Sequence, residues 1–476
     1  MLFNSFHFLF FFVIITSLYF LLPYNKRWAL LLAGSCYFYM AFVPLYILIL
    51  AFTIVIDYIA GIYIENSKGR RRKHFLILSL IANIGVLAVF KYYNFINENF
   101  SYLLQGFALK NPIPHLSILL PIGLSFHTFQ AMSYTIEVYR GHQKAERHFG
   151  IYSLYVMFYP QLVAGPIERP QNLLHQFREK FDFDYVRVVN GLKLILWGLF
   201  KKIVIADRLA IYVNAVYNHA DQHNGTTFIL ATFFFAIQIY CDFSGYSDIA
   251  IGCAKVMGFK LMTNFNRPYF SRSISEFWKR WHISLSTWFK DYFYISLGGN
   301  KVSVPRWYFN LFIVFLVSGI WHGANWTFII WGALNGFYLV FAVITQNTRD
   351  KINRMSGISK LPKLHYFLQV ITTFILCCFA WIFFRANNVN DAFTIIKKIF
   401  TFKGAVYYEN PSMLIYSFFG IIFLFLVEYK MEYYKGSFSF FNNPNWIIRN
   451  LSYAILLILI FLIGVFDGGE FIYFQF

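Results

Sequence analysis

The chain has 476 residues, of which 58% are hydrophobic and only 13% are charged. A soluble domain carries about 25% charged residues, so this composition excludes a water-covered globular protein and predicts one surrounded by lipid. The 41 basic residues outnumber the 22 acidic ones and give a net charge of +19. They fall mainly in short loops between apolar runs, which is typical of membrane orientation and argues against nucleic-acid binding.

Apolar stretches of about 20 residues recur from end to end, and each is long enough to span a bilayer. The runs are continuous rather than alternating, so they predict helices and not a barrel of strands. We expect an all-α polytopic membrane protein with about 11–13 membrane segments, including re-entrant or interfacial helices. A single integral membrane domain, residues 1–476, accounts for the chain. Its first run, residues 2–22, lacks a basic n-region and a cleavage site and is expected to be a retained helix.

The basic loops predict the orientation of the chain. The densest basic cluster, residues 68–73, is expected in the cytoplasm. Counting crossings from it places the N-terminus and the C-terminal tail, residues 467–476, outside. A long polar interruption, residues 263–307, is expected to be a helical insertion in the cytoplasm or at the interface. The five cysteines form no Cys-x-x-Cys pair, and neither a metal-ligating motif nor a nucleotide-binding loop is present, so no bound metal is expected.

Residues 241–258 form an apolar run that is interrupted by Gly245, Gly252 and Gly258. We expect an irregular backbone here, which is tolerated at membrane depth only when it is buried or lines a cavity. Polar side chains gather at this point, namely Asp242, Ser244, Tyr246, Ser247 and Asp248. They either cap a kinked helix or orient a ligand.

Residues 275–291 are predicted to form one amphipathic helix. Aromatic and apolar residues at three- and four-residue spacing form one stripe, namely Phe277, Trp278, Trp281, Leu285, Trp288 and Phe289. Polar residues share the other side, namely Ser275, Lys279, His282, Ser286 and Lys290. The helix either lies on the membrane surface with a solvated basic face or forms a basic mouth for an anionic donor, with His282 pointing inward.

His322 is the ionisable residue in the middle of an apolar run, between Trp321 and Gly323. An imidazole at membrane depth is a candidate functional group, and histidine is well suited to move a proton near neutral pH. The alternative is a core histidine that is bonded to a neighbouring helix. The aromatic end of the chain poses a similar choice, because Tyr473 either anchors the tail at the interface or reaches back toward a cavity.

Several motifs together resemble those of the membrane-bound O-acyltransferases. The most specific is Trp321-His322-Gly323-Ala324-x-Trp326-Thr327, followed by Trp331-Gly332. Residues 158–167, 240–248, 264–269 and 277–286 support it. Within the family, the chain is most similar to the bacterial branch that O-acetylates alginate or peptidoglycan or D-alanylates teichoic acid.

The resemblance implies a ring of helices around a central tunnel. An acyl group, in the first place acetyl, passes from a cytoplasmic thioester donor (acetyl-CoA or an acyl carrier protein) to hydroxyls of an extracytoplasmic polysaccharide. His322 matches the catalytic histidine and His282 the second histidine, while Tyr473 matches a C-terminal acyl relay. An outer SGNH-type acetyltransferase partner is implied. The candidates for lining the tunnel or binding the donor are Asp242, Ser244, Tyr246, Lys279, Arg280, Trp281, Ser286, Trp321 and Asn325.

Two alternatives remain open at this point. One is D-alanyl transfer to teichoic acid, which would use a carrier-protein donor. The other is a polytopic transporter without covalent chemistry, although the repeated halves of many transporters are not evident here. In the acyltransferase hypothesis, a neutral imidazole is the base for the attacking hydroxyl, and His282 or a backbone N–H stabilises the oxyanion.

Overall fold

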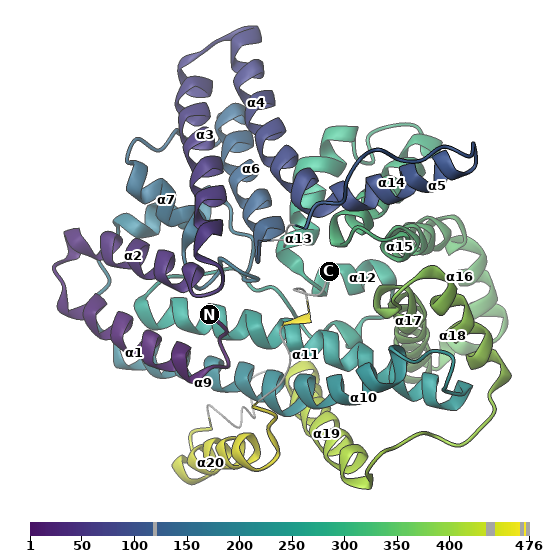
Figure 1. Cartoon of the computed structure of the whole chain (residues 1–476). Helices are drawn as coiled ribbons and strands as arrows, with labels where there is room; N and C mark the ends of the chain where they lie inside the picture. Colours follow the sequence, from purple (N-terminus) through teal and green to yellow (C-terminus); the bar gives the residue numbers. More distant parts are fainter. Residues whose placement is uncertain (118–120, 435–442, 467–470, 473–476) are drawn as a thin grey trace. The chain divides into compact units, whose positions relative to one another are not determined.

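The computed structural model describes residues 1–117, 121–434, 443–466 and 471–472, and the regular secondary structure in these ranges is helical (Figure 1). Eight helical stretches within the described ranges are long and apolar enough to cross a membrane: Pro44–Asn66, Gly69–Gln105, Gly225–Met257, Val304–His322, Trp326–Ile344, Pro362–Arg385, Pro411–Tyr433 and Trp446–Ile463. The all-α polytopic prediction is therefore confirmed. The expected total of membrane segments also included re-entrant and interfacial pieces, and shorter helices such as the apolar α1 (Phe6–Leu21) accompany the eight.

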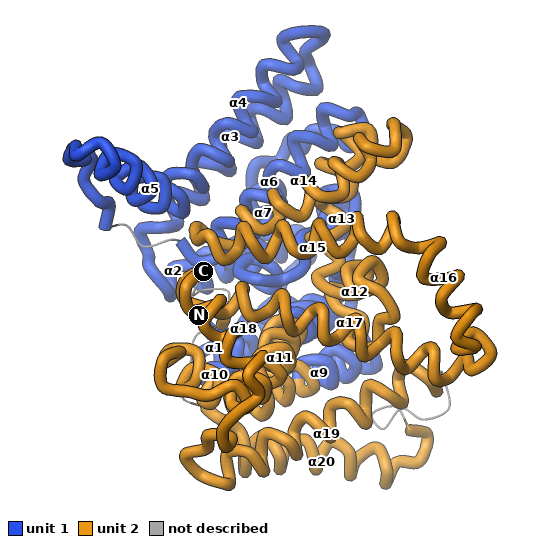
Figure 2. Tube along the Cα trace, turned by 90° about the vertical axis from the view of Figure 1, so that its right-hand side faces the viewer, with its two compact units in different colours: residues 1–195, 247–262 blue, residues 196–246, 263–476 orange. Residues whose placement is uncertain are grey.

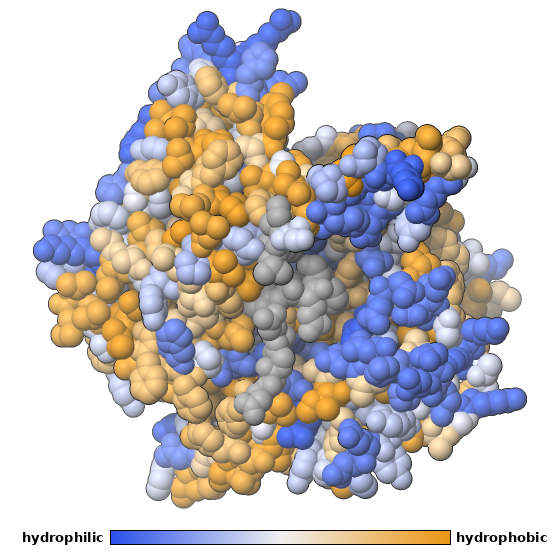
Figure 3. Space-filling model, in the orientation of Figure 1, coloured by the Kyte–Doolittle hydropathy of each residue, from blue (hydrophilic) through white to orange (hydrophobic). Residues whose placement is uncertain are grey.

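The surface carries the side chains that a lipid environment requires. On α20 (Trp446–Ile463), Phe461 is 69% exposed and Leu462 is 76% exposed. Figure 3 shows broad hydrophobic areas on the face that it draws. Exposing such side chains to water would be unfavourable, so these areas are expected to face acyl chains.

The chain divides into two compact units (Figure 2). Unit 1 comprises residues 1–195 and 247–262. It contains α1, α2 (Arg27–Met40), α3 (Ile47–Asn66), α4 (Gly69–Leu87), α5 (Tyr93–Gln105), α6 (Leu124–Arg140), α7 (Phe149–Met157), α8 (Pro170–Leu173) and most of α9 (Tyr185–Leu199). Helices α3, α4 and α6 pack together around buried Asp57, whose carboxylate accepts hydrogen bonds from Ser79 and Asn83.

Unit 2 comprises residues 196–246 and 263–476 and holds both predicted catalytic histidines. It contains α10 (Asp207–Tyr217), the first two thirds of α11 (Gly225–Met257), α12 (Ile274–Arg280), α13 (Ile283–Trp288), α14 (Val304–His322), α15 (Trp326–Ile344), α16 (Gln346–Met355), α17 (Pro362–Arg385), α18 (Val389–Thr401), α19 (Pro411–Tyr433) and α20. Its core is rich in aromatic side chains, among them Trp281, Trp331 and Trp381.

The expected break within residues 241–258 is wrong, because α11 is one continuous helix of 33 residues. The glycines allow close helix packing instead. A Cβ atom on Gly245 would lie 2.8 Å from the carbonyl oxygen of Gly198. Only Gly258 acts as a breaker, since it follows the helix with φ +109°. The polar residues from Asp242 onward therefore project from a regular helix and do not cap a kink.

The single helix predicted over residues 275–291 is also wrong. Helix α12 ends at Arg280, and His282 adopts a left-handed conformation (φ 43°, ψ 55°) before α13 begins. The segment 264–266 takes over the main-chain hydrogen bonds at this break: Asn266 N–H donates to the Arg280 carbonyl and Ile283 N–H to the Asn264 carbonyl. This pairing compensates for the helical bonds that are lost, and it turns His282 away from the exposed Lys279 and Lys290.

Candidate active site

His322 is positioned by a tightly packed helical hairpin. Helix α14 ends at His322, and Asn325 caps α15 by accepting the Thr327 N–H at 2.9 Å. The helices approach closely at Gly319 and Gly332, where a Cβ atom on Gly332 would lie 2.5 Å from the Phe315 carbonyl oxygen. The glycines of this stretch therefore bring two backbones together and fix the end of α14.

The His322 side chain lies in an aromatic enclosure and is only 5% exposed. Its ring centroid lies 4.8 Å from those of both Trp321 and Trp331, and 5.3 Å from that of Phe384. Trp331 and Phe384 present their rings at steep angles to the imidazole. These large side chains exclude water from the imidazole and hold its orientation.

His282 is fully buried and is held by Asn264. The Asn264 Oδ1 atom accepts the Ser284 N–H at 3.2 Å, so this atom must be the amide oxygen. It lies 3.1 Å from His282 Nδ1, which must therefore carry the hydrogen of this bond. Burial lowers the pKa of His282 to about 3. The imidazole is therefore neutral at physiological pH, and its Nε2 is the proton-accepting nitrogen.

Both histidines border one aromatic cluster. The Trp331 ring, which contacts His322, stacks on Trp381 at 5.9 Å, and Trp381 lies 5.1 Å from Trp281, the neighbour of His282 in the chain. On its other side, His282 contacts the Phe243 ring at 4.5 Å. The structure therefore places the two predicted catalytic residues around a shared buried core.

The described part of the C-terminal tail enters the same region. Phe471 and Ile472 are 1% and 2% exposed. The Phe471 ring lies 5.6 Å from Phe243 and 5.0 Å from Tyr246. The Ile472 N–H donates to an Asp242 carboxylate oxygen at 2.8 Å. Tyr473 itself lies outside the described residues.

Comparisons with known proteins agree on the family. Residues 135–386, which include both histidines, match the model of the membrane-bound O-acyltransferase family. A relative from Pseudomonas aeruginosa, named probable alginate O-acetylase AlgI, is 39% identical over 84% of this chain and 75% of its own length. The chain belongs to the membrane-bound O-acyltransferase family.

Other relatives of this O-acyltransferase carry different names. A peptidoglycan O-acetyltransferase of Helicobacter pylori is 35% identical over 80% of this chain and 75% of its own length. A teichoic acid D-alanyltransferase of Bacillus subtilis is 25% identical over 59% of this chain and 73% of its own length. The family membership favours an enzyme over the transporter alternative.

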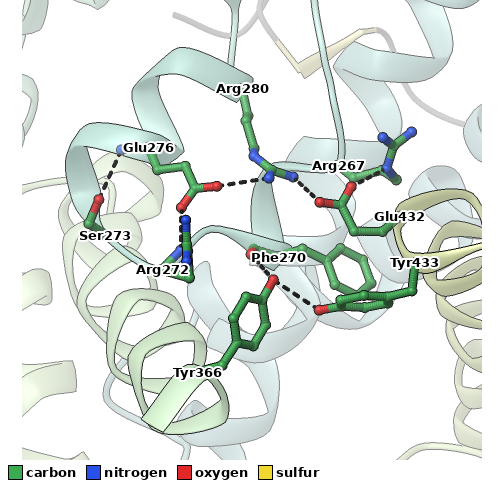
Figure 4. Close-up of polar contacts among 9 residues, drawn as sticks. All are labelled: Arg267, Phe270, Arg272, Ser273, Glu276, Arg280, Tyr366, Glu432 and Tyr433. Carbon is green, nitrogen blue, oxygen red and sulfur yellow. Dashed lines mark hydrogen bonds and ion pairs between the residues drawn. The ribbon is translucent and has the colours of Figure 1, made fainter. Parts of the chain in front are cut away.

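Several candidate donor-binding residues of the acyltransferase make well-defined contacts. Arg280 pairs with Glu276 and with Glu432, at 2.8 Å each, and Glu432 also pairs with Arg267 (Figure 4). This network links α12 to α19. Lys279, by contrast, is exposed. The Ser286 hydroxyl donates to the Trp281 carbonyl, and the Asn325 amide donates to the Asn387 carbonyl.

The candidates on α11 are buried. The Ser244 hydroxyl accepts from the Lys201 ammonium at 2.9 Å. Asp242 pairs with Lys202 at 2.8 Å, and Lys202 pairs with Asp207 at the same distance. Tyr246 packs against Phe471, as described above. The polar stretch of α11 therefore faces the interior of unit 2 rather than open solvent.

No role was predicted from the sequence for Asn264, Lys202 or Phe384. A signal was present for Lys202, because Lys201 and Lys202 interrupt an apolar run and an ionisable residue at such a place indicates a partner. Asn264 is bonded to His282 across 18 residues of sequence, a pairing without local signature. Phe384 belongs to a phenylalanine-rich helix and could not be distinguished from lipid-facing neighbours.

Proposed function

We propose that this O-acyltransferase transfers an acetyl group from a cytoplasmic thioester, acetyl-CoA or an acyl carrier protein, toward hydroxyls of an extracytoplasmic cell-wall polysaccharide or exopolysaccharide. The observation that carries the proposal is the enclosed His322 at the end of a membrane-spanning helix, within the family's matched region. The relatives named for acetylating alginate and peptidoglycan support acetyl as the group transferred.

His322 is proposed as the general base. The hydroxyl oxygen attacks the thioester carbonyl carbon while its proton passes to the His322 imidazole. The C–S bond then breaks, and the proton moves on to the departing thiolate, so that an ester and a thiol result. The aromatic enclosure supports this role because water kept away from the thioester cannot hydrolyse it.

His282 is proposed to orient the hydroxyl rather than to stabilise the oxyanion. Asn264 engages its Nδ1–H, so the neutral ring presents a lone pair at Nε2. A lone pair accepts a hydrogen bond from a hydroxyl and cannot donate one to an oxyanion. Oxyanion stabilisation is therefore assigned to other donors, such as a backbone N–H.

Tyr473 is proposed as the first acceptor, which passes the acetyl group to an outer SGNH-type partner for the final transfer. The support is the burial of Phe471 and Ile472, which directly precede it. Phe243 contacts both Phe471 and His282, so one side chain separates the tail from His282.

We further propose that residues 68–73 and 346–363 are cytoplasmic and that both termini are outside.

The test is incubation of the purified full-length protein with radiolabelled acetyl-CoA, followed by mass spectrometry of its peptides. We expect label on the C-terminal peptide of the wild type and no label in His322→Ala. Tyr473→Phe should also remain unlabelled. His74→Ala is the matched control, because His74 is an exposed histidine on α4, and it should behave as the wild type.

The outcomes separate the parts of the proposal. Label that persists in His322→Ala would overturn the role of His322. Label in Tyr473→Phe but not in His322→Ala would remove the relay and keep the acetyltransferase. Label only from a D-alanyl-loaded carrier protein would favour D-alanyl transfer, the activity for which the Bacillus subtilis relative is named.

A further inference from the structure

The π-helical turn Phe200–Ala206, which joins α9 to α10, lies against α20 and the residues just after it. Such turns are rare, are frequent at functional sites, and alter the main-chain bonding of a helix. Here the Ile203 carbonyl accepts the Val465 N–H at 3.0 Å. Just beyond the turn, Arg208 Nε donates to the Ile463 carbonyl at 2.9 Å. One main-chain group at the end of α20 and one just after it are thus bound by one short segment.

The same turn supplies a buried cation that reaches the tail through Asp242. Lys202 Nζ lies 2.8 Å from both Asp207 and Asp242, and all three side chains are buried. The second oxygen of the Asp242 carboxylate accepts the Ile472 N–H. Because Lys202 holds one oxygen of the Asp242 carboxylate, the other oxygen points in a fixed direction. Its hydrogen bond with the Ile472 N–H is charge-assisted.

One side chain, that of Phe243, separates the docked residues from His282. Phe471 packs between Phe243 and Tyr246, which lie one turn apart on α11. Phe243 also contacts the His282 ring. If the tail undocked, Phe243 would lose its contact with Phe471, and the residues that follow Ile472 would be displaced.

We propose that Lys202, Arg208 and Asp242 form a clamp: Arg208 holds the end of α20, and Asp242, itself held by Lys202, docks Ile472 one side chain away from His282. Lys202 and Asp242 are then positioning residues for acyl transfer. The proposal rests on the function proposed above, since the clamp would present the residue after Ile472 to the site. It assigns Asp242 a task other than binding the donor. Asp207 pairs with the same ammonium.

Thiol accessibility tests the docking without reference to catalysis. An Ile472→Cys substitution keeps the main-chain N–H that Asp242 binds, and its reaction with a water-soluble maleimide is followed in the purified full-length protein. Adding Asp242→Ala should raise the labelling rate of Cys at 472 about tenfold or more, because the segment loses a charge-assisted anchor. Asp350→Ala, which removes an exposed acid on α16, should leave that rate unchanged. Unchanged protection in Asp242→Ala would overturn the clamp.

Acyl transfer tests the consequence. Asp242→Ala should lower the turnover rate about tenfold or more and leave the KM for the thioester unchanged, because the donor does not touch the clamp. Ile472→Pro removes the N–H donor and leaves the Lys202–Asp207–Asp242 cluster intact, so it should lose turnover, whereas Ile472→Cys, which keeps the N–H, should not. Full turnover in Ile472→Pro would overturn the positioning role. A wild type that transfers no acyl group would defeat the proposed function, whereas the labelling rates would still decide the clamp.

Discussion

His282 shows at the scale of one residue how burial fixes a protonation state. Its folded-state pKa is about 3, below its ordinary value of 6.5. The unfolded chain therefore binds a proton that the folded chain does not, and stability falls as the pH drops below about 6.5. Lowering the pH from 7 to 5 should therefore reduce the free energy of unfolding by about 1–2 kcal/mol through this group alone.

Thermal unfolding of the wild type and of His282→Asn at pH 7 and pH 5 measures this effect. The asparagine amide can still donate to Asn264 but does not titrate, so the variant should lose less stability on acidification. All other ionisable groups are common to the two proteins and cancel in the comparison. An equal pH dependence in both proteins would show that His282 keeps its ordinary pKa in the folded state.

The sequence singled out the two candidate histidines but not the residues that they contact. His322 and His282 could be singled out because an imidazole in an apolar or aromatic stretch is conspicuous. Asn264 could not, because it acts through a bond to a residue 18 positions away that only the fold creates. The same holds for Asp242, whose contacts with Lys202 and Ile472 join three separate stretches of chain.

At the scale of elements, glycine decides how closely helices pack. Gly332 has no room for a Cβ atom beside α14, whereas a Cβ on Gly85 in α4 would meet nothing within 4 Å. Gly332→Ala should therefore cost about 2 kcal/mol or more and displace His322, while Gly85→Ala should be neutral or stabilise by up to about 1 kcal/mol. Melting temperatures in detergent and turnover rates measure both effects. Equal behaviour of the two variants would contradict the close approach of α14 and α15.

The two elements that were predicted wrongly share a cause. The glycines of α11 suggested a broken helix, yet Gly245 serves the approach of a neighbouring backbone, which local sequence does not reveal. The aromatic periodicity of residues 275–291 suggested one helix, yet the segment 264–266 offers alternative hydrogen bonds at His282. In both cases a tertiary contact outweighed a local pattern.

At the scale of the whole molecule, composition predicted a membrane protein, because nothing but lipid can cover so much apolar surface, and the continuous apolar runs predicted that it is helical. The orientation in the membrane, by contrast, depends on the charge of the short loops. If α14, α15 and α17 each cross the bilayer, α16 lies on one side, and the start of α18 lies on the other. The basic residues of 346–363 predict that the α16 side is cytoplasmic.

Cysteines at two exposed positions, Met355 at the end of α16 and Asn390 at the start of α18, test this arrangement. With a membrane-impermeant maleimide on intact cells, Asn390→Cys should be labelled at once and Met355→Cys only after the membrane is opened. The physical reason is that a helix that crosses the bilayer begins on one side of it and ends on the other. The protein without an added cysteine gives the background of its five native thiols, which are buried or partly buried. Labelling of both positions from outside would contradict the crossings, and labelling of Met355→Cys alone would reverse the orientation and place the end of α14, with His322, toward the cytoplasm.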